Sequence, residues 1–245
     1  MNSRFTGLRK ASQVKEGDGA DVRRLMPVAG FMNFDPFVLW DHFTVKPGAG
    51  FPTHPHRGFE AITYMFDGTM RHEDNLGNKS TVAMGGAQRF TAGRGMTHSE
   101  MPSEEGESQG IQLWINLPRQ LKKIDPDYQQ VDTDDFPRFD IHQGSLKVLV
   151  GEGSPLKIHT PVRYLDVQLD TGGRLGEDLA AGYRGLVYVV DGDVKINGNQ
   201  AEQGEGCFLE FPDELDIAAV SKARVMVCIG QPHHEPIRQY GPYVD

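Results

Sequence analysis

Glycine and proline divide this chain into short segments, and this punctuation restricts its fold more than any other feature. The 245 residues include 29 glycines and 15 prolines. Between them lie short apolar runs, such as FVLWDHFTV (37–45), EAITYMF (60–66) and QGIQLWINL (109–117). Each run ends at a turn signal, and no run of similar length has the periodicity of an amphipathic helix. The pattern predicts an all-β barrel or sandwich with little helix.

The second half of the chain repeats the pattern of the first. Tyr64-Met-Phe-Asp-Gly68 is echoed by Tyr188-Val-Val-Asp-Gly192 at an offset of 124 residues, and similar glycine-rich strands follow both. Asp-Gly turns after strands are common, so a chance match is the alternative. A polar, proline-containing segment, 118–144, separates the halves. We therefore predict two β-barrels in tandem, an N-terminal one at residues 1–130 and a C-terminal one at 131–245.

Composition narrows the classes of partner. The formal net charge is −9, and no Lys/Arg cluster in the sequence is larger than a pair, so direct nucleic-acid binding is disfavoured. No run of 18 apolar residues is present, and the N-terminus does not resemble a secretory signal, so no membrane association is expected. Cys207 and Cys228 lie in apolar runs and are predicted to be buried free thiols. These features indicate a cytoplasmic protein, or a nuclear one in a eukaryote.

Two histidines one residue apart suggest a metal site. His54 and His56 are flanked by Pro52 and Pro55, which disfavour a helix and fix an extended backbone. In an extended chain, residues i and i+2 face the same side, so both imidazoles point to one place. A single pair of this kind is more often a surface or packing feature than a ligand pair.

A second pair with the same spacing strengthens the metal hypothesis. His98 and Glu100 are also two residues apart, and Gly93 and Gly95 allow a tight turn that would return them beside the first pair. We expect the two pairs to lie on adjacent strands of a small barrel and to converge from opposite sides. The result would be three imidazoles and one carboxylate, which suits a catalytic transition metal.

The remaining candidates are weaker or compete with this set. Glu60 lies four residues past His56 and is an alternative to Glu100 as the fourth ligand. At the 124-residue offset, Asp178 and Ala180 stand where His54 and His56 would be, so the second barrel is predicted to lack metal. His42 and His72 are interpreted as satisfied polar residues, and His142 and His159 as isolated ones. His233 and His234 are adjacent, so in an extended chain they face opposite sides and make a poor chelating pair.

Several segments resemble the pirin family of the cupin superfamily. They are DPFVLWDHF, FPTHPHRGFEAITYMFDG, HEDNLGN, FTAGRGMTHSEMP, QLWINLP and EPIRQYGPYV. The resemblance implies two cupin-type barrels, a bicupin, with metal only in the first. It implies His54, His56, His98 and Glu100 as ligands, although Glu60 fits the general cupin pattern. It also implies one divalent ion per chain, with iron(II) favoured and manganese, nickel, copper and zinc left open.

The same resemblance implies two kinds of function. One is a quercetin 2,3-dioxygenase, which cleaves a flavonol with O2 while Glu100 takes the substrate's hydroxyl proton. For this reaction we expect Phe51, Arg57 and Gln112 at the rim of the pocket, because they lie near the ligands in sequence. The alternative is a redox-responsive regulator that acts through protein contacts, as a transcription coregulator or a regulator of metabolic enzymes.

Overall fold

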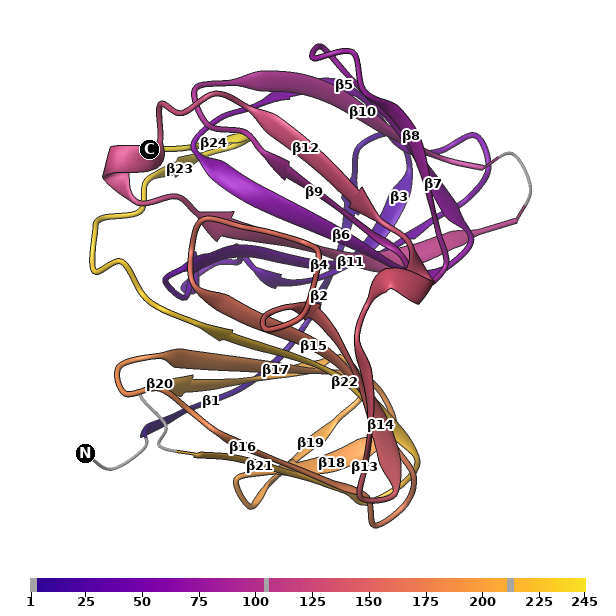
Figure 1. The fold of residues 1–245 in the computed structure, drawn as a ribbon, viewed down its shortest axis with the longest axis vertical. Helices are drawn as coiled ribbons and strands as arrows, with labels where there is room; N and C mark the ends of the chain where they lie inside the picture. Colours follow the sequence, from indigo (N-terminus) through magenta and orange to yellow (C-terminus); the bar gives the residue numbers. More distant parts are fainter. Residues whose placement is uncertain (1–3, 104–105, 211–213) are drawn as a thin grey trace. The chain divides into compact units, whose positions relative to one another are not determined.

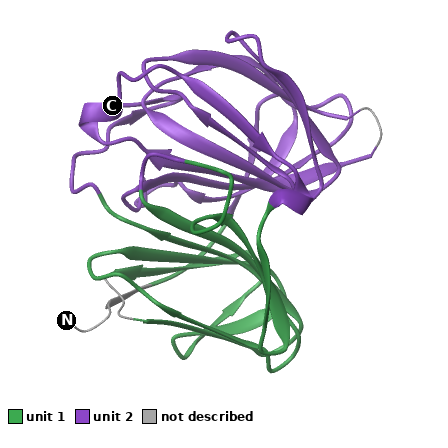
Figure 2. Cartoon of the chain, viewed as in Figure 1, with its two compact units in different colours: residues 1–11, 136–157, 161–232 green, residues 12–135, 158–160, 233–245 purple. Residues whose placement is uncertain are grey.

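A computed structural model describes residues 4–103, 106–210 and 214–245. These residues divide into two compact units (Figure 2). Unit 1 contains the described residues 4–11, 136–157, 161–210 and 214–232, and unit 2 contains 12–103, 106–135, 158–160 and 233–245. Both units are built almost entirely of β-strands (Figure 1). The all-β, two-barrel prediction is therefore confirmed.

Unit 2 contains two main sheets and a terminal strand pair. The seven-stranded sheet has the order β12 (Asp127–Val131), β9 (Ala87–Thr91), β6 (Phe59–Asp67), β11 (Ser108–Asn116), β4 (Phe37–Val45), β3 (Ala20–Met26), β2 (Ser12–Glu16). The four-stranded sheet has the order β5 (Phe51–His56), β10 (Met96–Pro102), β7 (Thr69–Asp74), β8 (Lys79–Ala83). Strands β23 (Gln239–Tyr240) and β24 (Tyr243–Val244) form the pair, and the short 3₁₀ helices are η1 (Arg119–Leu121) and η2 (Thr133–Asp135).

Unit 1 repeats this arrangement strand for strand. Its seven-stranded sheet has the order β1 (Arg4–Lys10), β20 (Glu205–Glu210), β17 (Arg184–Asp191), β22 (Ala223–Gly230), β15 (Val162–Leu169), β14 (Gly144–Val150), β13 (Arg138–Ile141). Its four-stranded sheet has the order β16 (Arg174–Asp178), β21 (Glu214–Ala219), β18 (Asp193–Ile196), β19 (Asn199–Glu202). Tyr64 on β6 and Tyr188 on β17 lie in equivalent strands, as the sequence repeat predicts.

The division between the units differs from the expected boundary at residues 130 and 131. The chain passes from unit 2 to unit 1 between residues 135 and 136. The N-terminal segment, up to residue 11, belongs to unit 1, and the C-terminal segment, 233–245, belongs to unit 2. Strand β1 pairs with β20 of unit 1, in the position that β12 occupies beside β9 in unit 2. The segment 118–144 is therefore not a plain connector, because β12 and β13 each add an edge strand to a sheet.

Each unit has its own apolar core. In unit 1, Val187, Val189, Val225 and Val227 belong to one large buried cluster, and Cys207 packs into it. Cys207 and Cys228 are buried and free, as predicted. None of the described helices is long and apolar enough to cross a membrane.

The C-terminal strand completes the core of unit 2. Val244 is fully buried and packs in one cluster with Phe59, Phe90 and Trp114. Gly58 has a φ of +86°, and a Cβ there would lie 1.8 Å from the Val244 carbonyl oxygen. Only glycine allows the last strand to approach this closely.

We expect Val244→Ala to reduce the free energy of unfolding by about 2 kcal/mol, because it removes buried methyl groups and leaves a cavity. Val220→Ala is the matched control, since Val220 is 47% exposed. Urea unfolding of both variants measures the difference. An equally small effect for both would show that the terminal strand does not contribute to the core.

Candidate metal centre

Pairing between β5 and β10 brings the two predicted ligand pairs together. In this antiparallel pair, His98 lies opposite His54, and Met96 lies opposite His56. One nitrogen each of His54, His56 and His98 lies within 4.8 Å of the others. The two pairs lie on adjacent strands, as expected, and their imidazoles converge. They approach side by side on neighbouring strands of one sheet, not from opposite sides.

Local sequence explains how these strands form. Strand β5 is at the edge of its sheet, where Pro52 and Pro55 cost few ladder hydrogen bonds. Gly93, in the turn before β10, has a φ of +48°, and a Cβ there would lie 2.2 Å from the Ile124 carbonyl oxygen. Along β10 burial alternates, so that Met96, His98, Glu100 and Pro102 share the buried face.

Hydrogen-bond partners orient all three imidazoles in the same way. His54 Nδ1 lies 2.7 Å from the Pro52 carbonyl oxygen, and His56 Nδ1 lies 3.3 Å from that of Pro242. Since a carbonyl can only accept, each Nδ1 carries the proton and donates it. The lone pair of a neutral imidazole is then on Nε2, and the Nε2 atoms of His54 and His98 are 3.1 Å apart.

A buried series of hydrogen bonds, from Asp74 through His72 to His98, gives His98 the same orientation. Asp74 Oδ2 accepts from His72 Nε2 at 3.0 Å, which leaves His72 Nδ1 as an acceptor. That atom lies 3.4 Å from His98 Nδ1. His98 therefore donates from Nδ1 and keeps the lone pair on Nε2. His72 was expected to be a satisfied polar residue, and the sequence did not indicate that it supports His98.

Burial keeps the imidazoles of His56 and His98 neutral. Desolvation, with the neighbouring His98 and His54, lowers the pKa of His56 to about 2. Desolvation, with His54 and His72, also holds the pKa of His98 well below its usual range. Metal ligation requires the unprotonated ring, so the protein keeps these two side chains in the required form at neutral pH.

Glu100 lies beside the imidazole cluster and is not part of it. Its carboxylate is buried and held by three donors. Oε1 accepts from Thr63 at 2.9 Å and from Gln88 at 2.6 Å, and Oε2 accepts from Gln112 at 2.7 Å. Because each carboxylate oxygen can accept two hydrogen bonds, Oε2 keeps one site open for a metal or a proton.

Glu60, the competing carboxylate, faces the other side of β6. Thr63, three positions along the strand, contacts Glu100, and an odd separation places two residues on opposite faces. Glu60 instead accepts from Thr91 at 2.8 Å, and from the His159 backbone N–H and Nδ1 at 2.8 and 2.9 Å. It anchors the segment 158–160 and points away from the imidazoles.

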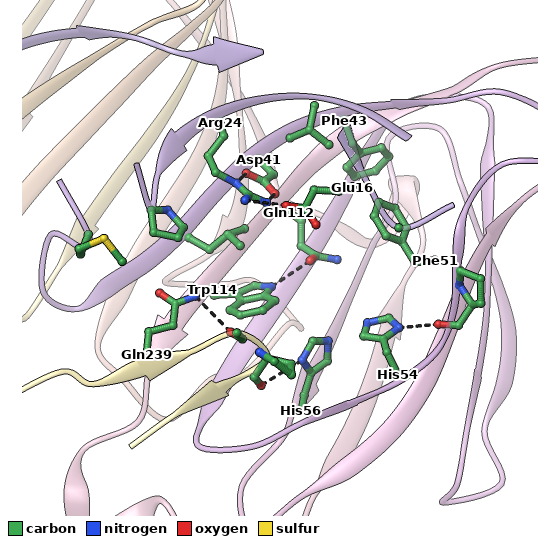
Figure 3. A pocket seen from close by; sticks show the side chains of 18 residues that line it. Glu16, Arg24, Asp41, Phe43, Phe51, His54, His56, Gln112, Trp114 and Gln239 are labelled. Atoms are coloured by element: carbon green, nitrogen blue, oxygen red, sulfur yellow. Dashed lines mark hydrogen bonds and ion pairs between the residues drawn. The ribbon is translucent and has the colours of Figure 1, made fainter. Parts of the chain in front are cut away.

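A cavity of about 460 Å³ opens onto His54 and His56 (Figure 3). Phe51 and Gln112 line it, as predicted, but Arg57 does not. Arg57 follows His56 directly, so its side chain faces the other way, and it pairs with Asp245. The lining residues that sequence reasoning missed include Glu16, Arg24, Asp41, Trp114, Gln239 and Pro242.

Two hydrogen-bonded groups shape the walls of this cavity. Trp114 Nε1 donates to Gln112 Oε1 at 2.9 Å, which directs the Gln112 amide N–H toward Glu100. On another wall, Arg24 contacts both oxygens of Asp41, at 2.8 and 2.6 Å. Burial raises the pKa of Asp41 to about 6, although Arg24 opposes that shift.

The donor set fits a transition-metal ion. Two nitrogen ligands of one ion, each bound at about 2.0–2.1 Å, lie roughly 3 Å apart when they are at right angles. The observed Nε2–Nε2 distance of 3.1 Å matches that spacing. In the described part of the chain, no second group of three such side chains is found.

Comparisons with known proteins identify the family. Residues 19–115 match the profile described as Pirin, and residues 164–245 match the Pirin C-terminal cupin domain. A Pseudomonas aeruginosa protein with the provisional name quercetin 2,3-dioxygenase is 40% identical over 247 residues, covering 93% of this chain and 87% of the relative. The fold is thus that of a bicupin. The chain belongs to the pirin family.

Two solved structures show the same fold. A quercetin 2,3-dioxygenase from Acinetobacter baumannii is similar with a TM-score of 0.90 and 31% identity, over 99% of this chain and 91% of that one. The bacterial pirin YhhW from Escherichia coli, solved in complex with nickel(II), has a TM-score of 0.77 and 30% identity, over 92% and 98% of the two chains.

The buried histidines predict a pH dependence of stability for the metal-free protein. As pH falls below the ordinary histidine pKa of about 6.5, His56 and His98 become protonated in the unfolded chain. In the folded protein their lowered pKa keeps them unprotonated, so the unfolded state binds more protons. Stability is therefore lost as pH falls, by about 2 kcal/mol for the His56 imidazole between about pH 7 and pH 5, and His98 adds to the loss in the same direction.

Urea unfolding across this range measures the loss. His56→Asn, which keeps a donor near Pro242, should reduce it by about one imidazole's share. His142→Asn, at an exposed position, is the control for removing a surface imidazole. Identical pH profiles for the wild type and His56→Asn would contradict the assignment.

Proposed function

We propose that the chain is a metal-dependent dioxygenase that opens the heterocycle of a flavonol such as quercetin with O2, and that iron(II) is its metal. His54, His56, His98 and Glu100 would hold the ion. The observation that carries the proposal is the set of three convergent imidazoles, two of which, His54 and His56, line a cavity. Support also comes from the relatives named as quercetin 2,3-dioxygenases.

The cavity has the size and lining that a flavonol requires. Its volume is within the range of about 300–1,000 Å³ that is usual for small-molecule sites. Phe51 and Trp114 present aromatic surface, and Leu39 and Phe43 extend the apolar wall. These side chains would bind the planar rings and exclude water, so that the hydroxyl and carbonyl groups of the substrate face His54 and His56.

The protein's own residues would then accept the proton of the substrate's hydroxyl group. A bound divalent ion lowers the pKa of a coordinated hydroxyl and holds the substrate beside O2. Glu100 has one acceptor site left, on Oε2, after the bond from Gln112. It would therefore hold the ion before the substrate binds and exchange that contact for the hydroxyl proton when the substrate takes its place. Gln112 lines the cavity and contacts Glu100, so it would fix the carboxylate relative to the substrate.

Flavonol consumption by the iron-loaded protein tests this role. We expect the wild type to remove the quercetin absorption band under air, and we expect Glu100→Gln to lose roughly a hundredfold in rate, as is typical when a general base is removed. Glu60→Gln is the matched control, because Glu60 is equally buried but faces away from the site. It should keep most of the activity.

Two results would overturn the proposal. One is a metal-loaded wild type that leaves quercetin unchanged with iron, manganese, nickel, copper and zinc in turn. The other is a larger loss for Glu60→Gln than for Glu100→Gln. The metal-free His98→Ala protein corrects for spontaneous oxidation of quercetin.

A further inference from the structure

A second cavity in unit 2 collects positive charge. Its volume is about 850 Å³, and six of its nine lining residues are cationic, against two acidic ones. The lining residues are Arg57, Arg94, Arg119, Lys122, Lys123, Glu235, Pro236, Arg238 and Asp245. This concentration occurs in a chain whose formal net charge is −9.

Three of the cations are already engaged. Arg57 donates to both carboxylate oxygens of Asp245, at 3.2 and 2.9 Å, and Arg94 pairs with Asp125 at 2.9 Å. Lys122 Nζ donates to three oxygens, those of the Gly58 and Val244 carbonyls and the Asn116 side chain, at 2.7–2.9 Å. Burial also lowers the pKa of Lys122 to about 8.

The other three cations have no such partner. Among the described residues, no hydrogen bond or ion pair is made by the side chains of Arg119, Lys123 and Arg238, and all three residues are exposed. Glu235, the second acidic residue of the lining, accepts from the backbone N–H of Arg119 at 2.6 Å, and its charge also acts on Lys122. With six cations against two carboxylates, the lining keeps an excess of positive charge, and a bound anion would relieve the repulsion among the cations.

Rigid backbone supports two of these cations. Arg119 begins η1, where the Leu121 N–H donates to the Pro118 carbonyl oxygen at 2.8 Å. Arg238 and Asp245 exchange two backbone hydrogen bonds, of 2.9 and 2.8 Å, across the β23–β24 pair. The guanidinium groups are thus attached to fixed points, which reduces the entropy lost when a ligand binds.

The lining also defines the class of ligand. Guanidinium groups bind phosphate and carboxylate oxygens in a two-pronged geometry, and several of them favour a ligand with more than one anionic group. None of the described residues that line this cavity is aromatic, so the lining offers no stacking surface to a nucleobase or a flavonol. The volume is in the range of small-molecule sites.

We propose that this cavity binds a small, non-aromatic anion that carries two or more phosphate or carboxylate groups, and that Arg119, Lys123 and Arg238 contact it. The site is distinct from the cavity at His54 and His56, and it does not depend on the proposed dioxygenase function.

Calorimetric titration of the full-length, metal-loaded protein at low ionic strength tests this inference. The probes are tripolyphosphate, which carries several phosphate groups, and citrate, which carries several carboxylate groups. We expect saturable binding of at least one probe. The Arg119→Ala/Arg238→Ala double variant should weaken it by roughly a hundredfold or more, because it removes two charged hydrogen-bond donors.

The Lys46→Ala/Lys79→Ala double variant is the matched control. It removes the same charge from the same unit at two exposed lysines outside the cavity, and it should bind as the wild type does. Because the probes also chelate metal, the titration is repeated after metal removal, and binding at the cavity should persist.

Four outcomes would overturn the inference. They are no binding of either probe, equal affinity in the wild type and the Arg119→Ala/Arg238→Ala variant, an equal loss in the lysine control, and binding that disappears with the metal. Binding of polyglutamate with no binding of the small probes would also contradict it, since it would indicate an acidic protein surface as the partner.

Discussion

The site depends on one register, the pairing of β5 with β10 that sets His98 opposite His54. This pairing brings the Nε2 atoms of the two residues to 3.1 Å, and His56 joins them because it is two positions from His54 on the same strand. A one-residue slip of β10 would turn His98 and Glu100 to the opposite face. The glycine turn at Gly93 and the buried face of β10 both oppose such a slip.

Residues distant in sequence orient the imidazoles that this register brings together. The Pro242 carbonyl oxygen orients His56, and Asp74 orients His98 through His72. The segment that carries Pro242 also places Val244 in the core of unit 2 and Asp245 against Arg57. One short segment therefore contributes to the orientation of His56, to the apolar core and to the basic cavity. This explains why the last strand belongs to unit 2 although it follows all of unit 1 in sequence.

Local sequence was enough to predict the strands, from glycine and proline punctuation, and the repeat, from a matching pentapeptide. Period-two alternation predicted the shared faces of His54 with His56 and of His98 with Glu100. It also explains the error on Arg57, since nearness in sequence says nothing about the face of a strand. The contact by which His72 orients His98, and the assignment of the two chain ends to the units, depend on contacts between distant segments. The basic cavity does too, because Arg57, Lys122 and Arg238 come from separate parts of a sequence that shows no basic cluster.

The central claim is that unit 2 holds a single metal ion on the imidazoles that β5 and β10 bring together. Elemental analysis of the purified wild type and of His98→Ala tests it most directly, with circular dichroism as the check on folding. The account predicts about one ion per wild-type chain and almost none in a folded His98→Ala protein, because two imidazoles and a carboxylate leave the ligand set incomplete. Full metal occupancy in His98→Ala, or two tightly bound ions in the wild type, would contradict it.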